Sequence, residues 1–421
     1  MLTQAPKGTK DVLPSDSYKW QYLEGLFRDI CKSFGYKELR TPTFEHTELF
    51  ERGVGETTDV VQKEMYTFED KKGRSITLKA EGTAPAARAF IENKLYAEAQ
   101  PTKIFYITPV FRYERPQKGR LREHHQFGIE VFGSNDAAVD AEVMSIVATL
   151  YKKLGLNEVE LHINSIGCPE CRKKYNETLM NYLSTKIDNL CKTCQSRYDK
   201  NPMRILDCKV ESCQEEIKDA PLILDHICDE CKVHFEKVQD YLSSLNIEFT
   251  VDHKIVRGLD YYTKTAFEFV SSGIGAQDTV CGGGRYDGLI ESIGGPSTPG
   301  IGFGMGIERL MLYLETNNIE IPNSDEVDVF IVTIGERAEK EAFKILYNLR
   351  NNGVSADKDY LGRSMKAQFK YSNKINSTYT IVIGDEEIEK DVVTLKNMKT
   401  GDQNEIKLSN LINTIKEKLG R

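Results

Sequence analysis

The chain has 421 residues, of which 40% are hydrophobic, 29% are charged and 9% are aromatic. At roughly 100 to 200 residues per domain this length predicts two to four domains, and the composition excludes a mini-protein and a disordered chain. The formal net charge of −8 argues against a protein that binds nucleic acid over its whole surface, but it does not exclude a local basic patch.

The N-terminal segment MLTQAPKGTKDVLP has no apolar secretory core, and no stretch of the chain approaches the roughly 18 uninterrupted apolar residues of a membrane span. We therefore expect a cytoplasmic protein without a membrane partner. In such a protein the ten cysteines are expected to be thiols or metal ligands rather than a disulfide framework.

The first predicted element is an amphipathic helix over residues 18–34, followed by a short strand that stops at Pro42. Residues 103–114 and 124–133 have β-patterned sequences on either side of the polar segment RPQKGRLRE, which predicts a long antiparallel hairpin. Further strands are expected over residues 158–164, 265–270 and 278–283. These elements predict an α+β fold with a large antiparallel sheet rather than a doubly wound parallel sheet.

A domain boundary is expected after Asp325, because residues 320–325 are polar and turn-forming. The charge balance also changes there, from a net −9 over residues 1–325 to a net +1 over residues 326–421. Beyond the boundary strand and helix patterns alternate, which predicts a compact α/β domain over residues 326–421. Its elements are expected over residues 327–334, 336–351, 354–357, 364–374, 379–384, 391–408 and 410–418.

Residues 168–245 are expected to be an insertion that interrupts domain 1–325, and residues 168–231 hold eight of the ten cysteines. The cysteines form the close pairs Cys168/Cys171, Cys191/Cys194, Cys208/Cys213 and Cys228/Cys231. The first two pairs are 19 residues apart, which fits the template of a four-cysteine structural zinc site. Reduced, unligated thiols are the alternative, and the sequence does not decide which cysteines would share one metal.

The segment 112–122 places five cations within eleven residues at the mouth of the predicted hairpin. A solvated charged loop is the ordinary explanation of such a run, but Arg112 is expected inside the strand, where a charge needs a partner. A phosphate would be such a partner, so we predict a site for polyanions.

Two further segments carry chemistry. Residues 257–262, RGLDYY, place an arginine, a carboxylate and two phenols together, although core tyrosines beside a surface ion pair are an equal alternative. The glycine-rich segment 300–310 leads into a helix, where glycine allows close approach of a ligand or backbone. Its spacing fits neither the dinucleotide fingerprint nor the P-loop.

Together these segments resemble a bacterial histidyl-tRNA synthetase, a class II aminoacyl-tRNA synthetase. The helix and strand up to Pro42 resemble class motif 1, residues 111–114 with their hairpin resemble motif 2, and residues 304–309 resemble motif 3. Residues 257–262 resemble the signature of the histidine-specific enzymes. The resemblance covers nearly the whole chain, because residues 326–421 resemble the anticodon-binding domain of the family.

The resemblance implies that ATP activates L-histidine to histidyl-adenylate, and that the histidyl group is then transferred to the 3′ end of tRNA(His). Arg112 and Arg257 would grip the α-phosphate, and Arg309 would hold the far end of ATP, with Mg²⁺ bridging the phosphates. The residues that the resemblance assigns to histidine are Glu81, Gly82, Thr83, Gln126, Glu130, Tyr261 and Tyr262. Those expected to contact tRNA are Gln117, Lys118, Arg120, Arg122, Arg363, Lys366 and Lys370.

The C-terminal residues of that set, together with Lys374, recur at three- and four-residue spacing and predict one basic helix face beside Tyr371. A solvated face is the commoner meaning of such a stripe. In a chain of net charge −8, however, a local stripe suits an RNA backbone.

The resemblance also implies a homodimer formed through motif 1. Three other functions stay open at this point. A non-catalytic paralogue that regulates histidine biosynthesis is expected to lack the anticodon domain and the arginine signature. A class II synthetase of other specificity is expected to lack residues 257–262, and a zinc-ribbon RNA-binding protein would not bind ATP.

Overall fold

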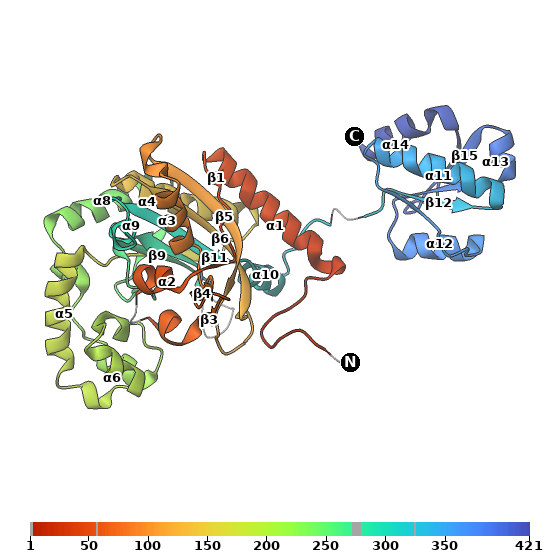
Figure 1. The fold of residues 1–421 in the computed structure, drawn as a ribbon. Coiled ribbons are helices and arrows are strands. Elements are labelled where there is room, and N and C mark those ends of the chain that lie inside the picture. Colours follow the sequence, from red (N-terminus) through yellow and green to blue (C-terminus); the bar gives the residue numbers. More distant parts are fainter. Residues whose placement is uncertain (1–2, 56–57, 272–278, 324–325) are drawn as a thin grey trace. The chain divides into compact units, whose positions relative to one another are not determined.

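The computed structural model describes residues 3–55, 58–271, 279–323 and 326–421, and the chain divides into two units, Met1–Ile321 and Pro322–Arg421 (Figure 1). This division falls a few residues before the expected boundary after Asp325, a residue that lies outside the described ones. Each unit has its own sheet and its own apolar core. No helix among the described residues is long and apolar enough to cross a bilayer.

The first unit is built on an eight-stranded sheet with the strand order β1-β5-β6-β11-β10-β9-β7-β8. The inner strands pair antiparallel, whereas the edge strands β1 and β8 pair parallel with β5 and β7. The expected large antiparallel sheet is thus confirmed in its centre and mixed at its edges. The strands are β1 (Lys37–Glu38), β5 (Thr102–Phe111), β6 (Glu123–Phe132), β7 (Val159–Ser165), β8 (Phe249–Val251), β9 (Thr263–Ser271), β10 (Thr279–Arg285) and β11 (Gly300–Gly306).

The predicted hairpin is formed by β5 and β6, and the predicted strands at residues 158–164, 265–270 and 278–283 correspond to β7, β9 and β10. The first residue of the last prediction, Asp278, lies outside the described residues. The glycine-rich segment expected to lead into a helix is itself a central strand, β11, and the helix α10 begins directly after it.

One face of this sheet is covered by helices and carries the main core. Alternate side chains of the strands, among them Phe127, Ile129 and Phe303, pack there against α1, α4, α8 and α10. Phe27 of α1 stacks on Phe127 with ring centroids 4.6 Å apart. The helices of this unit outside the insertion are α1 (Pro14–Ser33), α2 (Thr47–Val54), α3 (Thr83–Glu92), α4 (Ala137–Lys153), α9 (Leu289–Ser292) and α10 (Ile307–Thr316).

The opposite face is covered in part by α3, α9 and the insertion, and the unit also has a small sheet of order β2-β4-β3. Because β strands alternate their side chains between the two faces, the second set of side chains points to this side. The strands of the small sheet are β2 (Phe44–His46), β3 (Tyr66–Glu69) and β4 (Ser75–Leu78).

The expected insertion is helical and begins directly after β7 (Figure 1). The helices before α8 share an apolar cluster with α3 and α9, in which Leu179, Leu183 and Ile205 are buried, whereas α8 packs in the main core. They are α5 (Pro169–Leu183), α6 (Lys192–Tyr198), the 3₁₀ turn η4 (Pro202–Ile205), α7 (Glu211–Glu216) and α8 (Asp229–Ser244).

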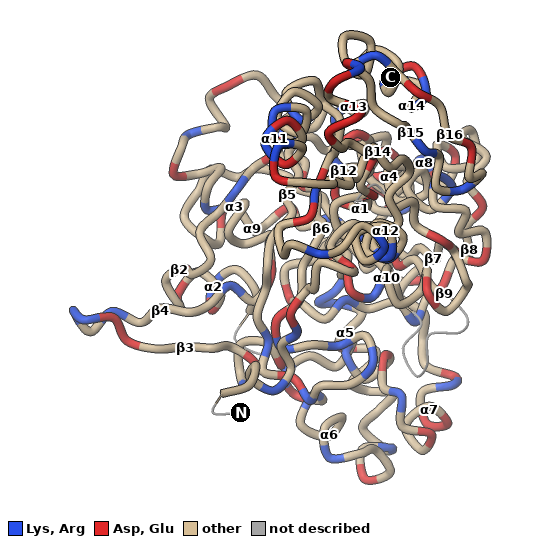
Figure 2. The backbone as a smooth tube through the Cα atoms, turned by 90° about the vertical axis from the view of Figure 1, so that its right-hand side faces the viewer, with Lys and Arg blue, Asp and Glu red and all other residues tan. Residues whose placement is uncertain are grey.

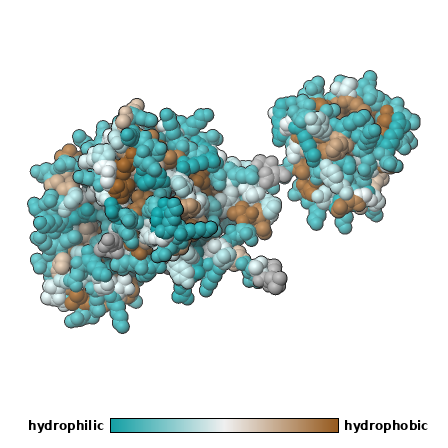
Figure 3. All heavy atoms as spheres, viewed as in Figure 1, coloured by the Kyte–Doolittle hydropathy of each residue, from teal (hydrophilic) through white to brown (hydrophobic). Residues whose placement is uncertain are grey.

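The second unit has a five-stranded sheet of order β13-β12-β14-β15-β16, with β12, β13 and β14 parallel and β15 and β16 forming a hairpin. The α/β pattern predicted from the sequence is therefore confirmed. Its elements are β12 (Val329–Thr333), α11 (Glu336–Asn351), β13 (Ala356–Lys358), α12 (Met365–Lys374), β14 (Tyr379–Ile383), α13 (Asp385–Glu389), β15 (Val392–Asn397), β16 (Gln403–Lys407) and α14 (Leu411–Leu419). The visible surface of the molecule is mostly hydrophilic, with a few apolar patches (Figure 3).

Candidate active site

The partly covered face of the large sheet, opposite the main core, has a floor of glycines. In the β6–β11 register, Gly302 is opposite Glu130, Gly304 opposite Gly128 and Gly306 opposite Gln126. All these residues point to the partly covered face, because residues two apart in a strand share a face. On the next strand, Gly282 pairs with Gly304.

Polar side chains lie across this floor, in the space that side chains at the glycine positions would occupy. A β-carbon on Gly302 would lie 1.9 Å from Glu130 Oε2, and one on Gly304 would lie 2.2 Å from Gln126 Nε2. A β-carbon on Gly282 would meet the guanidinium of Arg257 at 2.6 Å. The glycines are therefore required by the functional groups above them.

Glu130 is the most buried carboxylate of this face, with no exposed surface. It accepts hydrogen bonds from the Tyr106 hydroxyl at 2.9 Å and from the Tyr286 hydroxyl. Burial raises the pKa of Glu130 to about 8. A carboxyl group held this way in an apolar setting suits recognition of a ring that offers one N–H donor or acceptor.

Beside it, Glu81 and Gln126 organise the start of α3. Glu81 is buried and accepts from the backbone N–H groups of Thr83 at 2.7 Å and Ala84 at 2.6 Å. Gln126 Oε1 accepts from the Gly82 N–H at 3.0 Å. Burial raises the pKa of Glu81. Four residues that the sequence assigned to histidine therefore form one connected group.

Residues 257–262, here called the arginine signature, lie on the same face. Arg257 forms an ion pair with Glu268 of β9, and its guanidinium lies 5.4 Å from the ring centre of Tyr262. Its Nε is buried and has no hydrogen-bond partner among the described residues. Tyr262 and Tyr261 have ring centroids 4.6 Å apart. A buried cation with an unused donor is suited to an anionic ligand.

Tyr261 links the two halves of the site. Its ring centre lies 5.4 Å from that of Tyr286, whose hydroxyl bonds Glu130. The residues expected to bind histidine and residues 257–262 are more than 100 positions apart in sequence. Aromatic contacts thus join them in the fold.

Arg112 does not lie inside the strand as expected but directly after β5 ends at Phe111. Its Nε donates to the carbonyl oxygen of Ala80 at 2.8 Å, next to Glu81, and this bond orients the guanidinium. The guanidinium of Arg112 therefore lies at the edge of the glycine floor and is not buried beneath a covered face of the sheet.

Arg309 lies in the first turn of α10, which follows β11. The neighbouring Glu308 accepts from the His125 backbone N–H at 3.0 Å and lies 3.1 Å from His125 Nδ1, which fastens this turn to β6. A β-carbon on Gly306 would lie 3.8 Å from Arg309 Cβ, so the three arginines that the sequence assigned to ATP come from three segments beside the glycine floor.

The hairpin loop carries the other predicted polyanion contacts. Gln117 and Lys118 are exposed, Arg120 pairs with Glu114 at 3.0 Å, and Arg122 stacks on Tyr113 at 3.8 Å. A cavity of about 420 Å³ lies against this loop and is lined by Lys63, Glu64, Tyr113, Glu114, Arg115, Gln117 and Arg120.

Three further residues of the candidate site were not predicted from the sequence: Tyr106, Tyr286 and Glu268. Tyr106 is opposite Gly128 in the hairpin register, and a β-carbon on Gly128 would lie 2.3 Å from its ring. The signal for Tyr106 is that a large residue pairs with a glycine on the neighbouring strand. This pairing can be recognised only when the register of the two strands is known.

The family model described as Histidyl-tRNA synthetase matches residues 8–310, and that of an anticodon binding domain matches residues 328–418. The histidine–tRNA ligase of Caldanaerobacter subterraneus is 62% identical over 99% of this chain and all of its own length. The chain belongs to the histidyl-tRNA synthetase family.

Other members of the family agree with this. The histidine–tRNA ligase of Clostridioides difficile is 61% identical over the full length of both chains. The apo histidyl-tRNA synthetase of Staphylococcus aureus superposes with a TM-score of 0.85 at 44% identity, covering 99% of this chain and all of that one. The predicted family and class II fold are confirmed. The matched anticodon domain also counts against a paralogue that has lost it.

In this family member the basic face of the C-terminal domain is smaller than predicted. Lys366, Lys370 and Lys374 of α12 are exposed, and parts of α12 have the colour of lysine and arginine in Figure 2. Arg363 precedes the helix, pairs with Asp359 at 2.5 Å and lies 4.4 Å from the Tyr371 ring centre. Arg363 therefore lies outside α12, and the helix itself carries the three lysines.

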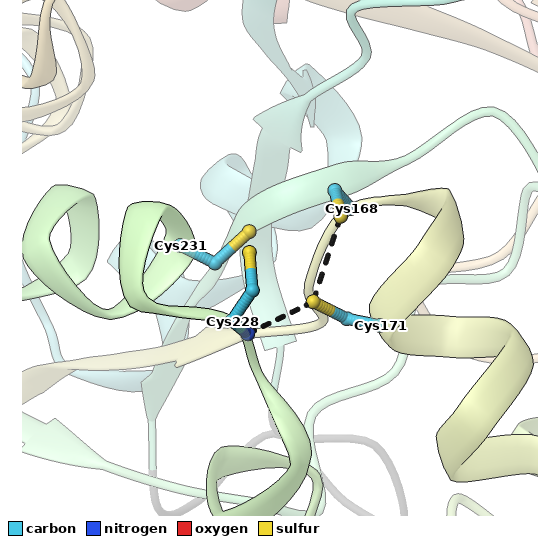
Figure 4. A group of neighbouring side chains, drawn as sticks. All are labelled: Cys168, Cys171, Cys228 and Cys231. Atoms are coloured by element: carbon cyan, nitrogen blue, oxygen red, sulfur yellow. Dashed lines mark hydrogen bonds between the residues drawn. The ribbon is translucent and has the colours of Figure 1, made fainter.

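The cysteines of the insertion gather in two groups of four, and this settles a grouping that the sequence left open. Cys168 and Cys171 join Cys228 and Cys231 (Figure 4), whereas Cys191 and Cys194 join Cys208 and Cys213. The physical reason is that α5 and α8 return to each other at the base of the insertion, which the linear spacing cannot reveal.

Proposed function

We propose that the glycine-floored face binds L-histidine and ATP side by side, and that this enzyme forms histidyl-adenylate there before charging tRNA(His). The observation that carries the proposal is the arrangement of Glu130, Gln126 and Arg257 across Gly302, Gly304 and Gly282. Only glycines leave room for these side chains, so the sheet and the polar groups form one site.

Histidine occupies the end of the face at Glu130. Glu130 and Tyr262 hold the imidazole ring, and Tyr261 lines the pocket. The α-ammonium group is held by Glu81, Gln126 and Thr83, at the start of α3. A buried pocket of hydrogen-bonding groups rejects amino acids that leave those groups unpaired, because each unpaired group is destabilising.

ATP lies toward the arginines. In the first step a histidine carboxylate oxygen attacks the α-phosphorus, a P–O bond forms, and the bond to pyrophosphate breaks. Arg112 and Arg257 stabilise the negative charge that develops at phosphorus, and Arg309 holds the far end of ATP. No protein nucleophile is needed, since alignment and fixed charge supply the catalysis.

In the second step a hydroxyl of the 3′-terminal ribose of tRNA attacks the carbonyl carbon of the adenylate. The ester forms, AMP leaves, and the hydroxyl proton is released. Lys118, Gln117, Arg120 and Arg122 contact the RNA beside the site. The lysines of α12 contact it in the anticodon domain, together with Arg363 if the Arg363–Asp359 pair opens.

Aminoacyl-tRNA synthetases use ATP with a divalent metal, which we assign as Mg²⁺ carried by the phosphates. Mg²⁺ prefers oxygen ligands and supplies charge neutralisation when bound. Glu268, which pairs with Arg257 and accepts a hydrogen bond from the Thr279 hydroxyl at 2.7 Å, offers at this end of the face the carboxylate oxygens that Mg²⁺ prefers as ligands. Zinc, the second predicted metal, is assigned to the insertion and takes no part in the reaction.

The enzyme is expected to act as a homodimer in the cytoplasm, where translation supplies its substrates. Support comes from the segment that resembles motif 1, because the Phe44 side chain next to it is 55% exposed. An isologous interface would bury this apolar surface. Light scattering at micromolar concentration should give twice the chain mass, and the mass of one chain would contradict the dimer.

Histidine-dependent ATP–pyrophosphate exchange tests the proposed function. We expect exchange with L-histidine and none with the other amino acids, followed by charging of tRNA(His) when RNA is added. Exchange that does not require histidine, or its absence in folded protein, would contradict the proposal.

A further inference from the structure

The eight cysteines of the insertion form two compact groups of thiols. Within each group the four sulfur atoms all lie within 4.8 Å of one another. Cys168 Sγ lies 3.5 Å from Cys171 Sγ, and Cys191 Sγ lies 3.9 Å from Cys208 Sγ. All eight lie among the described residues, and each is a free cysteine rather than half of a disulfide.

These separations are those of ligands around one tetrahedral metal ion. With zinc–sulfur bonds of about 2.3 Å, tetrahedral geometry places the sulfur atoms about 3.8 Å apart, between the two measured separations. A disulfide requires about 2.05 Å instead. Four sulfurs without a histidine or carboxylate ligand favour zinc over magnesium or calcium.

The first group lies at the base of the insertion (Figure 4), where two long helices begin. Cys168 caps α5 and Cys228 caps α8, and the second cysteine of each pair follows three residues later. The Cys228 N–H donates to Cys171 Sγ at 3.1 Å. The starts of the two helices thus bring the four cysteines of this group together.

The second group lies in the outer part of the insertion and has the same features. Cys194 and Cys213 have no exposed surface, and the Cys191 N–H donates to Cys213 Sγ at 3.1 Å. The helices that carry these cysteines have seven and six residues, too few to be stable without other support. A metal ion would supply that support.

We propose that the insertion binds two zinc ions in two separate, closed sites, one formed by Cys168, Cys171, Cys228 and Cys231 and the other by Cys191, Cys194, Cys208 and Cys213. Sulfur fills every coordination position, so neither ion activates water. Structural zinc sites of this kind stabilise the folded state of small segments.

Both sites hold segments that contact the arginine signature. Next to the inner site, Arg172 donates to the Asp260 carbonyl oxygen at 3.4 Å. Next to the outer site, Asn201 donates to Asp260 Oδ1 at 2.9 Å, and Arg204 donates to the Gly258 carbonyl oxygen at 2.7 Å. The zinc ions therefore fix the loop that follows Arg257, although they lie outside the reaction.

The metal content of the full chain, purified without chelator, tests this proposal. Elemental analysis should give two equivalents of zinc. The variants C168S/C171S and C191S/C194S should each retain one equivalent, whereas Cys31→Ala, which removes a buried cysteine of α1, should retain two. Circular dichroism identifies any variant that does not fold.

Two measurements on the wild-type chain keep the test decisive if a variant unfolds. An organomercurial that captures thiols should release two zinc ions to a chromogenic chelator. Cobalt exchanged into the protein should give the intense absorption of tetrahedral thiolate coordination. Less than half an equivalent of zinc, iron in its place, or loss of both ions from a folded double variant would overturn the proposal. These outcomes do not depend on aminoacylation, so they are separable from the proposed function.

Discussion

The carboxylate of Glu130 lies across the backbone of Gly302 on the neighbouring strand, where a β-carbon would come within 1.9 Å of Oε2. Gly302→Ala should therefore displace Glu130 and lower kcat/KM for histidine about tenfold or more, since overpacking costs about 1 to 3 kcal/mol. Pyrophosphate exchange at varied histidine concentration measures this.

Gly288→Ala is the matched control for that change, because its added β-carbon would meet no side chain or backbone of the described residues within 4 Å apart from its own neighbours in the chain. It should leave the kinetics unchanged. If Gly302→Ala is folded and also has normal histidine kinetics, the glycine floor does not belong to the site.

The pH dependence of the free energy of unfolding should reveal the protonation of Glu130. Its pKa of about 8 in the folded protein lies above the ordinary value of 4.5, because the carboxyl group is buried. The folded protein thus keeps a proton that the unfolded chain loses. The free energy of unfolding should fall as the pH rises from about 4.5 to about 8, and Glu130→Gln should reduce this slope.

Denaturant unfolding at a series of pH values measures the slope. Part of it should persist in Glu130→Gln, because burial also raises the pKa of Glu81. The exposed Glu248→Gln controls for the loss of one carboxylate. An identical slope in Glu130→Gln and wild type would show that Glu130 is charged when folded.

The elements with a strong local pattern were predictable from the sequence. The helix expected over residues 336–351 matches α11, and the expected hairpin matches β5 and β6. These segments have a clear hydrophobic period that tertiary packing reinforces. The glycine segment 300–306 lacks such a signal, because it gains its strand structure from its neighbours β6 and β10.

The site was predictable only in the parts that a family motif marks. Arg112 and Arg257 were predicted from such motifs, and Glu130 was predicted from the wider family resemblance. Tyr286, which donates its hydroxyl to Glu130, comes from a distant segment whose position depends on the sheet order. The pairing of the cysteines likewise depends on where α5 and α8 return to each other. Such long-range relationships have no local signal in one sequence.

Removal of the C-terminal unit should separate the two reactions. A chain ending at Asp325 keeps the glycine floor and its polar residues, so pyrophosphate exchange should remain largely intact. Charging of tRNA(His) should be strongly impaired, because α12 is missing. Equal loss of both activities would mean that the second unit also supports the catalytic core.

The exposed lysines of α12 should contribute to RNA affinity by neutralising phosphates. Lys366→Ala/Lys370→Ala should weaken tRNA binding, and the slope of log affinity against log salt should become shallower by about one unit for each phosphate no longer neutralised. Filter binding at several salt concentrations measures both quantities. Lys340→Ala on α11, also exposed, is the control, and an equal effect there would remove α12 from the interface.

The central claim is that this face of the sheet forms the adenylate, and Arg257 tests it most directly. Rapid-quench measurement of histidyl-adenylate in a single turnover should show a rate reduced by a factor on the order of 10² to 10³ for Arg257→Ala, since one interaction with transition-state charge is worth about 3 to 4 kcal/mol. Arg257→Lys should fall between Arg257→Ala and wild type, because it keeps the charge but not the fork. A folded Arg257→Ala protein that forms adenylate at nearly the wild-type rate would contradict the account.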